Sequence, residues 1–179
     1  MNPIIESILN IEGGYVNNPA DRGGPTKWGI TQTTARNHGY QGDMRDLTRD
    51  QAYAILEQDY WIAPGFDRIA QLSESLAFEL CDAGTNIGPS YPSRWLQRWL
   101  NAFNQQAKKY DDIQVDGHIG NNTLNALRSY LDWRGREGEK IMLQALNCSQ
   151  GEYYLQITEK RAANETFIYG WIRERITVK

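Results

Sequence analysis

The sequence begins with a pattern typical of a short amphipathic helix, which ends at a double glycine and leads into a turn-rich segment, and this pattern limits the possible folds. Asn2 is typical of an N-cap, and Pro3 is typical of a first helical position. Apolar residues then recur on one helical face, namely Ile4, Ile5, Ile8 and Leu9. The pair Gly13-Gly14 predicts the end of this helix, because glycine readily adopts the left-handed C-terminal cap. Residues 15–31 are rich in Asn, Pro, Asp, Gly and Thr, which predicts turns and a short hairpin.

The rest of the chain is dominated by helical patterns. Leu47-Thr48-x-x-Gln51 resembles a capping box and predicts a helix that continues to about Tyr60. Apolar spacing predicts further helices over residues 73–87, 92–104, 122–130, 138–147 and 150–163, followed by an aromatic segment, 167–171. No internal repeat or low-complexity tract interrupts the chain. The predicted fold class is mainly α with a small β element.

Composition excludes several function classes. The 179 residues carry a formal net charge of -3, which argues against nucleic acid as the main partner. No apolar run approaches the roughly 20 residues that span a bilayer, and Met1–Glu6 lacks the basic start of a secretory signal. Two cysteines, Cys81 and Cys148, and two histidines, His38 and His118, are too few for a disulfide framework, a zinc site or a Ser-His-Asp triad. An enzyme of this composition is expected to work without metal or cofactor, through carboxylates.

Glu12 is the first candidate for such chemistry. On a helical wheel it continues the apolar stripe, in the last turn before the double glycine. Burial and the negative end of the helix dipole both disfavour a carboxylate, which predicts a raised pKa and a role as general acid. The alternative is that the helix ends one residue earlier and Glu12 points to water; position alone leaves both open.

Asp21 follows nine residues later, in the turn-rich segment. Glycoside hydrolysis needs one carboxylic acid to protonate the leaving oxygen and a second carboxylate to position water or attack the sugar. A loop that returns over the helix end would bring Asp21 and Glu12 into one cleft. The alternative is an Asp that only caps a turn through its own side chain.

The segment from Glu12 to Thr31 resembles the signature of glycoside hydrolase family 108. It reads Glu-Gly-Gly-Tyr-Val-Asn-Asn-Pro-Ala-Asp-Arg-Gly-Gly-Pro-Thr-Lys-Trp-Gly-Ile-Thr. Further matches follow over nearly the whole chain, including Tyr60-Trp61, Cys81–Gly88, Trp95-Leu96-Gln97, Asp116–Thr123, Arg161 and Gly170-Trp171-Ile172. Members of this family are peptidoglycan-cleaving N-acetylmuramidases, found among phage endolysins and in bacterial systems that help proteins cross the wall.

The resemblance implies a lysozyme-like fold, mainly α with a small β-hairpin. It implies a catalytic lobe at residues 1–88 and a helical lobe at residues 89–179 that is similar to a predicted peptidoglycan-binding domain. The substrate and partner would then be peptidoglycan, cleaved between N-acetylmuramic acid and N-acetylglucosamine, with no metal, no stable membrane insertion and a monomer expected. Without a readable signal, such a hydrolase would reach the periplasm or wall through a holin-type pore, a dedicated exporter or lysis.

The resemblance also assigns residues. Glu12 corresponds to the catalytic acid of the family. Phage-type lysozymes place an Asp after eight intervening residues, as Asp21 is, and then a Thr after five more. The Thr spacing departs here, since four residues separate Thr26 from Asp21 and nine separate Thr31, so the choice between the two stays open.

Six residues are candidates for contact with the sugar. One is Thr31, and each of the other five also has an ordinary structural explanation. Tyr15, Trp28, Tyr60 and Trp61 have the half-apolar character of sugar-binding clefts, but core packing explains them equally well. Asn86 is suited to an N-acetyl group, or to a role at a helix end.

Two other functions remain open from the sequence. One is a cell-wall-binding protein that has kept the fold without turnover. The other is a chitinase- or chitosanase-like hydrolase. An amidase or peptidase is disfavoured because it normally requires a metal or a Cys-His pair.

Overall fold

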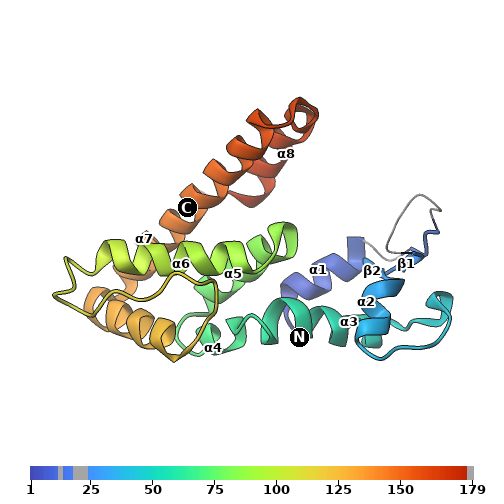
Figure 1. The fold of residues 1–179 in the computed structure, drawn as a ribbon, viewed down its shortest axis with the longest axis horizontal. Coiled ribbons are helices and arrows are strands. Elements are labelled where there is room, and N and C mark those ends of the chain that lie inside the picture. Colours follow the sequence, from blue (N-terminus) through green and yellow to red (C-terminus); the bar gives the residue numbers. More distant parts are fainter. Residues whose placement is uncertain (12–13, 18–23, 177–179) are drawn as a thin grey trace. The chain divides into compact units, whose positions relative to one another are not determined.

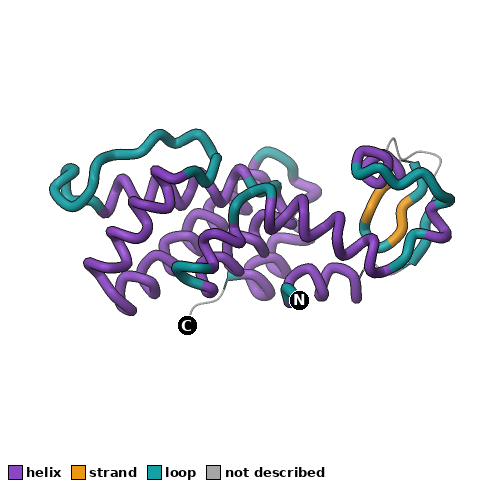
Figure 2. Tube along the Cα trace, turned by 90° about the horizontal axis from the view of Figure 1, so that it is seen from below, coloured by secondary structure: helices purple, strands orange, loops and turns teal. Residues whose placement is uncertain are grey.

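The computed structural model describes residues 1–11, 14–17 and 24–176 of the chain. The described residues are mainly helical, and their strands form a small antiparallel pair, as Figures 1 and 2 show. The predicted fold class, mainly α with a small hairpin, is confirmed. The chain divides into two compact units, Met1–Ala63 (unit 1) and Pro64–Lys179 (unit 2).

In the described part of the chain, no helix combines the length and the apolar character that crossing a membrane requires.

Unit 1 surrounds the first helix and the hairpin. Its elements are α1 (Pro3–Ile11), β1 (Thr26–Lys27), β2 (Ile30–Thr31), α2 (Gln32–Asn37), the 3-10 turn η1 (Met44–Asp46), α3 (Arg49–Glu57) and the π-helical turn η2 (Gln58–Ile62). α1 begins as predicted, because the Asn2 side-chain oxygen accepts a hydrogen bond from the Ile4 amide at 2.9 Å. Ile5 and Leu9 are fully buried on the face that packs against α3. The Tyr53 hydroxyl, on α3, accepts a hydrogen bond from the Asn2 amide at 2.7 Å.

The capping box of α3 is present. The Thr48 hydroxyl accepts a hydrogen bond from the Gln51 amide at 3.3 Å, and the Gln51 side chain accepts one from the Thr48 amide at 3.0 Å. Ala52, Ile55 and Leu56 are buried, as their spacing predicts. The helical turn continues beyond Glu57 as η2, which places Tyr60 and Trp61 in a π-helical rather than an α-helical segment.

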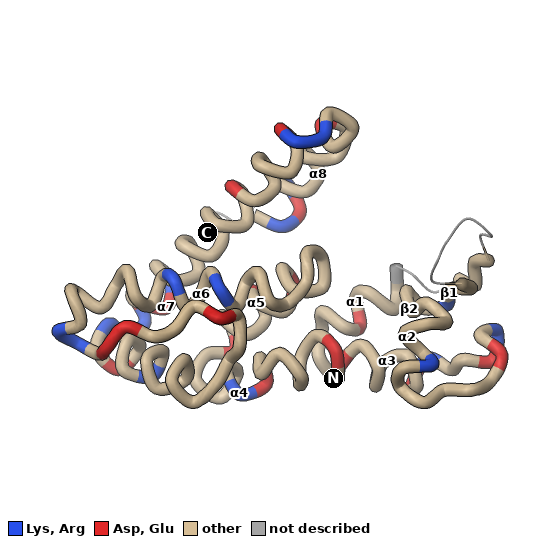
Figure 3. Tube along the Cα trace, in the orientation of Figure 1, with Lys and Arg blue, Asp and Glu red and all other residues tan. Residues whose placement is uncertain are grey.

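Unit 2 is an assembly of helices that carry both acidic and basic residues, as Figure 3 shows. Its elements are α4 (Phe66–Ala70), α5 (Glu74–Ile87), α6 (Ser90–Phe103), α7 (Asn121–Glu159), the 3-10 turn η3 (Ala162–Asn164) and α8 (Glu165–Arg175). α5 packs against α4, α6 and α7, and α7 also packs against α6 and α8. The core of unit 2 contains Phe66, Leu76, Leu80, Leu96, Leu100, Leu127, Met142 and Tyr154.

α7 is interrupted between the predicted helices 122–130 and 138–147, but residues 138–159 form one continuous helix where two were predicted. The break is at Gly135, where φ is 60° and ψ is -149°, and helix continues on both sides. The Tyr130 hydroxyl donates a hydrogen bond to the Gly138 carbonyl at 2.8 Å across this break. The aromatic segment 167–171 lies within α8, where Phe167 stacks on Trp171 with ring centroids 6.0 Å apart.

Candidate functional site

The hairpin of unit 1 holds most of the residues that the sequence singles out. Thr26 pairs with Thr31, and an isolated bridge joins Thr26 to Val16 through two main-chain hydrogen bonds of 2.8 Å. Trp28 and Gly29 form the turn with φ values of 56° and 74°, the left-handed pair typical of a two-residue hairpin. The hairpin is therefore tied to the segment that follows α1.

The two candidate carboxylates, Glu12 and Asp21, lie outside the described residues. Glu12 follows Ile11, the last residue of α1, and Asp21 lies between the described residues Asn17 and Gly24.

Trp28 is anchored inside unit 1. Its indole N–H donates a hydrogen bond to the Leu47 carbonyl at 3.0 Å, which holds the hairpin against the segment before α3. The Lys27 ammonium donates a hydrogen bond to the Arg45 carbonyl. The Arg45 guanidinium in turn lies 5.5 Å from the ring centre of Tyr15, which is 36% exposed. Tyr15 thus keeps part of its ring in contact with water beside a cation.

The two candidate threonines differ in what their hydroxyls do. Thr31 is the N-cap of α2, where its hydroxyl accepts a hydrogen bond from the Thr34 amide at 3.2 Å and lies 3.0 Å from the Thr34 hydroxyl. Thr26 is half-buried in β1, and its main chain pairs with Val16. The Thr31 hydroxyl is therefore engaged in local structure.

Tyr60 and Trp61 are half-buried in η2. Burial, and to a smaller extent the neighbouring Asp59, raises the pKa of Tyr60, so its phenol stays neutral over the physiological range. The His38 ring nitrogen Nε2 lies 2.9 Å from the Asp59 carboxylate, which ties the end of α2 to η2.

Asn86 belongs to unit 2, whereas the aromatic and Thr candidates belong to unit 1. It is exposed near the end of α5, and its side-chain N–H donates a hydrogen bond to the Tyr154 hydroxyl at 3.0 Å. That hydroxyl also accepts a hydrogen bond from Gln150 at 3.0 Å. The amide of Asn86 is therefore oriented by a buried pair on α7.

Glu79 is a titratable group that the sequence analysis missed. Burial raises the pKa of its carboxyl to about 7, and the nearby Asp82 carboxylate adds to this, while a hydrogen bond with Asn147 acts in the opposite direction. Asp82 is paired with Arg175 at 2.9 Å. The sequence signal that could have identified Glu79 is its position on the predicted helix 73–87, at the edge of the apolar face.

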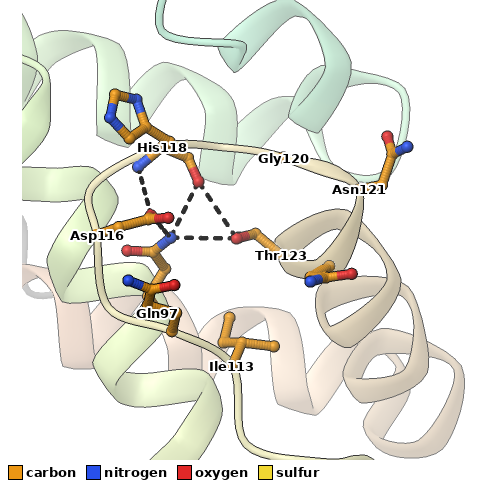
Figure 4. A pocket seen from close by; sticks show the side chains of 9 residues that line it. Gln97, Ile113, Asp116, His118, Gly120, Asn121 and Thr123 are labelled. Atoms are coloured by element: carbon orange, nitrogen blue, oxygen red, sulfur yellow. Dashed lines mark hydrogen bonds between the residues drawn. The ribbon is translucent and has the colours of Figure 1, made fainter.

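The segment Asp116–Thr123 is organised around the buried side chain of Gln97, as Figure 4 shows. The Gln97 N–H group donates to the Asp116 carboxylate at 2.8 Å, to the His118 carbonyl at 3.0 Å and to Thr123 at 3.2 Å. Its oxygen accepts from the Gly117 amide at 2.8 Å. The amide of His118 and the side chain of Gln97 hold the pKa of Asp116 below its usual value. The segment also lines a cavity of about 310 Å³.

Among residues 1–11, 14–17 and 24–176, no group of three His, Cys, Asp or Glu side chains is arranged to hold a metal ion.

Residues 5–88 match the family described as Glycosyl hydrolase 108. This is a family of glycoside hydrolases of the N-acetylmuramidase type. The N-terminal part of the chain is therefore a glycosyl hydrolase 108 domain. The following residues, 91–176, match the Predicted Peptidoglycan domain. The chain is thus a glycoside hydrolase, and its two matched domains together support action on peptidoglycan at the cell wall.

The whole chain is similar in structure to SagA of Brucella abortus. The TM-score is 0.63 at 24% sequence identity, and the match covers 96% of this chain and 86% of that one. The likeness shows a shared fold. A comparison with curated protein sequences gave no match.

Proposed function

We propose that the chain is an N-acetylmuramidase that hydrolyses the β-1,4 bond between N-acetylmuramic acid and N-acetylglucosamine in peptidoglycan. The observation that carries this proposal is the order of domains, a family 108 match at 5–88 followed by a peptidoglycan domain at 91–176. A hydrolytic part that covers residues 1–88 would be kept on its polymer by a wall-binding part, 89–179.

Glu12 is the proposed general acid. It follows α1 directly in the sequence, at the end where the helix dipole is negative, and α1 carries the buried residues Ile5 and Leu9. A carboxylic acid kept protonated near neutral pH by such surroundings can protonate the bridging oxygen. General acid assistance of this kind is typically worth about 10²–10⁴-fold in rate.

Asp21 is the proposed partner carboxylate. Charge builds at the anomeric carbon as the glycosidic bond breaks, and a carboxylate stabilises that oxocarbenium-like state. A threonine hydroxyl beside it would steer the attacking water. Thr26 suits this role better than Thr31, because the Thr31 hydroxyl already caps α2.

The proposed sugar-binding residues differ in how much of each side chain is available to a sugar. Tyr15, with its partly exposed ring, can stack on the apolar face of a sugar, whereas Trp28 uses its N–H to hold the hairpin. Tyr60 and Trp61 are half-buried and would contribute through their exposed edges. Asn86 uses its N–H for Tyr154, which would leave its carbonyl oxygen to accept from the N–H of an N-acetyl group.

The biological setting is part of the proposal. A hydrolase of this kind would serve host lysis as an endolysin, or protein passage through the wall, and would be antimicrobial when applied from outside. We propose that it acts as a monomer, after holin-type or dedicated export.

The experiment that tests this function compares the wild type with Glu12→Gln. The variant should clear purified peptidoglycan about 10²–10⁴ times more slowly, while it still sediments with the walls. Glu137→Gln, at an exposed position on α7, is the matched control and should keep full activity. Wall binding without clearing by the wild type would make the chain a wall-binding protein, and an active Glu12→Gln would remove Glu12 as the acid.

A further inference from the structure

Unit 2 contains two adjoining cavities that the proposed chemistry does not use. The cavity of about 310 Å³ in Figure 4 and a second one of about 370 Å³ share Ile113, Gln114 and Asn122 in their walls. Together they make one polar groove between the segment that follows α6 and the first turns of α7. We define the groove by its exposed or half-exposed polar side chains, Asp111, Asp112, Gln114, Asp116, Asn122 and Asn125.

We propose that the polar groove binds the stem peptide of peptidoglycan and recognises a free ammonium group on it. This inference rests on the proposed function, since that function supplies peptidoglycan as the polymer in contact with the chain.

The groove is built before any ligand arrives. Asn101, on α6, donates a hydrogen bond to the Ile113 carbonyl at 2.8 Å and accepts one from the Ile113 amide at 2.9 Å. Asn104 donates to the Asp112 carboxylate at 2.6 Å. The buried Gln97 fixes the Asp116 end of the groove in the same way. A wall held at both ends loses little conformational entropy when a ligand binds.

The groove walls are suited to a peptide rather than to a glycan strand. Sugar-binding clefts present aromatic faces to the ring of a sugar. Among the described residues that line the groove, Tyr110 is the one Phe, Trp or Tyr. It donates its hydroxyl to the Leu100 carbonyl at 2.8 Å, and burial raises its pKa to about 12. Carboxamides line the open part instead, at Gln114, Asn122 and Asn125, and each offers a donor and an acceptor to peptide groups.

The negative charge of the groove favours binding of a positively charged ammonium group. Three carboxylates line it, those of Asp111, Asp112 and Asp116, and no Lys or Arg is among its lining residues. The nearby Lys109 places its ammonium over the Trp133 ring, 4.9 Å from the ring centre. A stem peptide carries a diamino acid whose second amine is free wherever the strand is not cross-linked. Such an amine pairs with carboxylates through charge-assisted hydrogen bonds.

The test is an NMR titration of the full chain, in which the side-chain amides of Gln114, Asn122 and Asn125 report binding. The first probe is the tripeptide L-Ala-γ-D-Glu-diaminopimelate, and the second is the same peptide with its side-chain amine acetylated. The free peptide should shift the three amides, and acetylation should weaken binding about two- to fivefold, as expected for an exposed ion pair.

The matched variants are Asp111→Asn and Asp132→Asn. Asp111 lines the groove, and Asp132 is exposed on α7 outside it. Asp111→Asn should weaken binding of the free peptide by about the same factor as acetylation, and Asp132→Asn should leave it unchanged. The inference is overturned if the peptide shifts none of the three amides, if a peptide-free chitooligosaccharide shifts them as strongly, or if both variants weaken binding equally.

This test is independent of turnover. If the groove binds the peptide while the wild type releases no sugar ends from walls, the proposed hydrolysis fails and the groove assignment stands. If hydrolysis depends on Glu12 while the amides do not respond, only the groove assignment fails.

Discussion

Glu79 illustrates how its surroundings set the chemistry of one carboxyl group. Its usual pKa of 4.5 rises to about 7, first because the group is buried and second because it faces the Asp82 carboxylate. The Arg175 guanidinium is paired with Asp82, and the Tyr154 hydroxyl and the Asn147 amide are also nearby. The folded chain therefore binds one more proton here than the unfolded chain does at pH values between 4.5 and 7.

The contribution of this proton to stability is fully present below the pKa of Glu79 in the unfolded chain. It is lost as the pH rises through the pKa of Glu79 in the folded chain. We expect the free energy of unfolding of the wild type to fall between pH 5 and pH 8, with roughly 2–3 kcal/mol of the fall coming from this group. Glu79→Gln should remove this fall, and Glu74→Gln, at an exposed position on the same helix, should not. Urea unfolding at both pH values measures it, and an identical fall in Glu79→Gln would contradict the assignment.

The two hairpin threonines give a second prediction for single residues. Thr31→Val should lower the free energy of unfolding by about 1 kcal/mol, because the N-cap of α2 is lost. Thr26→Val should reduce kcat more than Thr31→Val does, with a smaller loss of stability. Both variants are measured by urea denaturation, which reports the capping role of Thr31, and by peptidoglycan turnover, which reports the proposed catalytic role of Thr26. A larger drop in kcat for Thr31→Val would reverse our choice of Thr26.

At the scale of elements, the sequence predicts the helices that carry their own local signals. α1 and α3 begin where Asn2 and Thr48 predict, because a cap depends on residues next to it in the chain. α2 was missed, because Gln32–Asn37 has no apolar periodicity, and its helix depends on the cap at Thr31. The aromatic segment of α8 gave no helix prediction, because packing against α7 stabilises it.

The candidate site was predictable only where a motif is local. Glu12 and Asp21 come from one continuous signature. The raised pKa of Glu79 depends mainly on burial, which packing of α5 against α4, α6 and α7 provides and which a pattern within α5 does not contain. The same applies to the orientation of Asn86 by Tyr154, 68 residues away.

The break in α7 gives a prediction for a whole element. Gly135 has φ 60° and ψ -149°, a backbone region that is accessible almost only to glycine. Gly135→Ala should therefore lower the free energy of unfolding by about 1–3 kcal/mol. Gly151→Ala is the control on the same helix, where an added Cβ would meet only an Ile172 methyl at 3.9 Å, and it should stabilise by about 0.5–1 kcal/mol. Equal effects in thermal or urea unfolding would contradict this explanation of the break.

At the scale of the molecule, the limits of the family match and of the compact units differ. The hydrolase match runs to residue 88, whereas the second compact unit begins at Pro64. α4 and α5 thus belong to the hydrolase match but pack in unit 2, where α5 buries Leu76 and Leu80 completely.

We therefore expect a fragment of residues 1–88 to lack a stable α5. Without α6 and α7, the apolar face of α5 would be exposed to water. The fragment should therefore contain less helix than residues 1–88 contain in the full chain, and it should bind a hydrophobic dye. Circular dichroism and dye fluorescence measure both. A fragment that has its full share of helix and cleaves walls would contradict this expectation.

The identity of the cleaved bond decides whether the chain is an N-acetylmuramidase, and mass spectrometry of the products from purified peptidoglycan identifies that bond. After reduction with borohydride, muropeptides that end in reduced N-acetylmuramic acid are expected from the wild type, and none from Glu12→Gln. Products that end in reduced N-acetylglucosamine, or intact glycan strands with cleaved peptides, would contradict the claim.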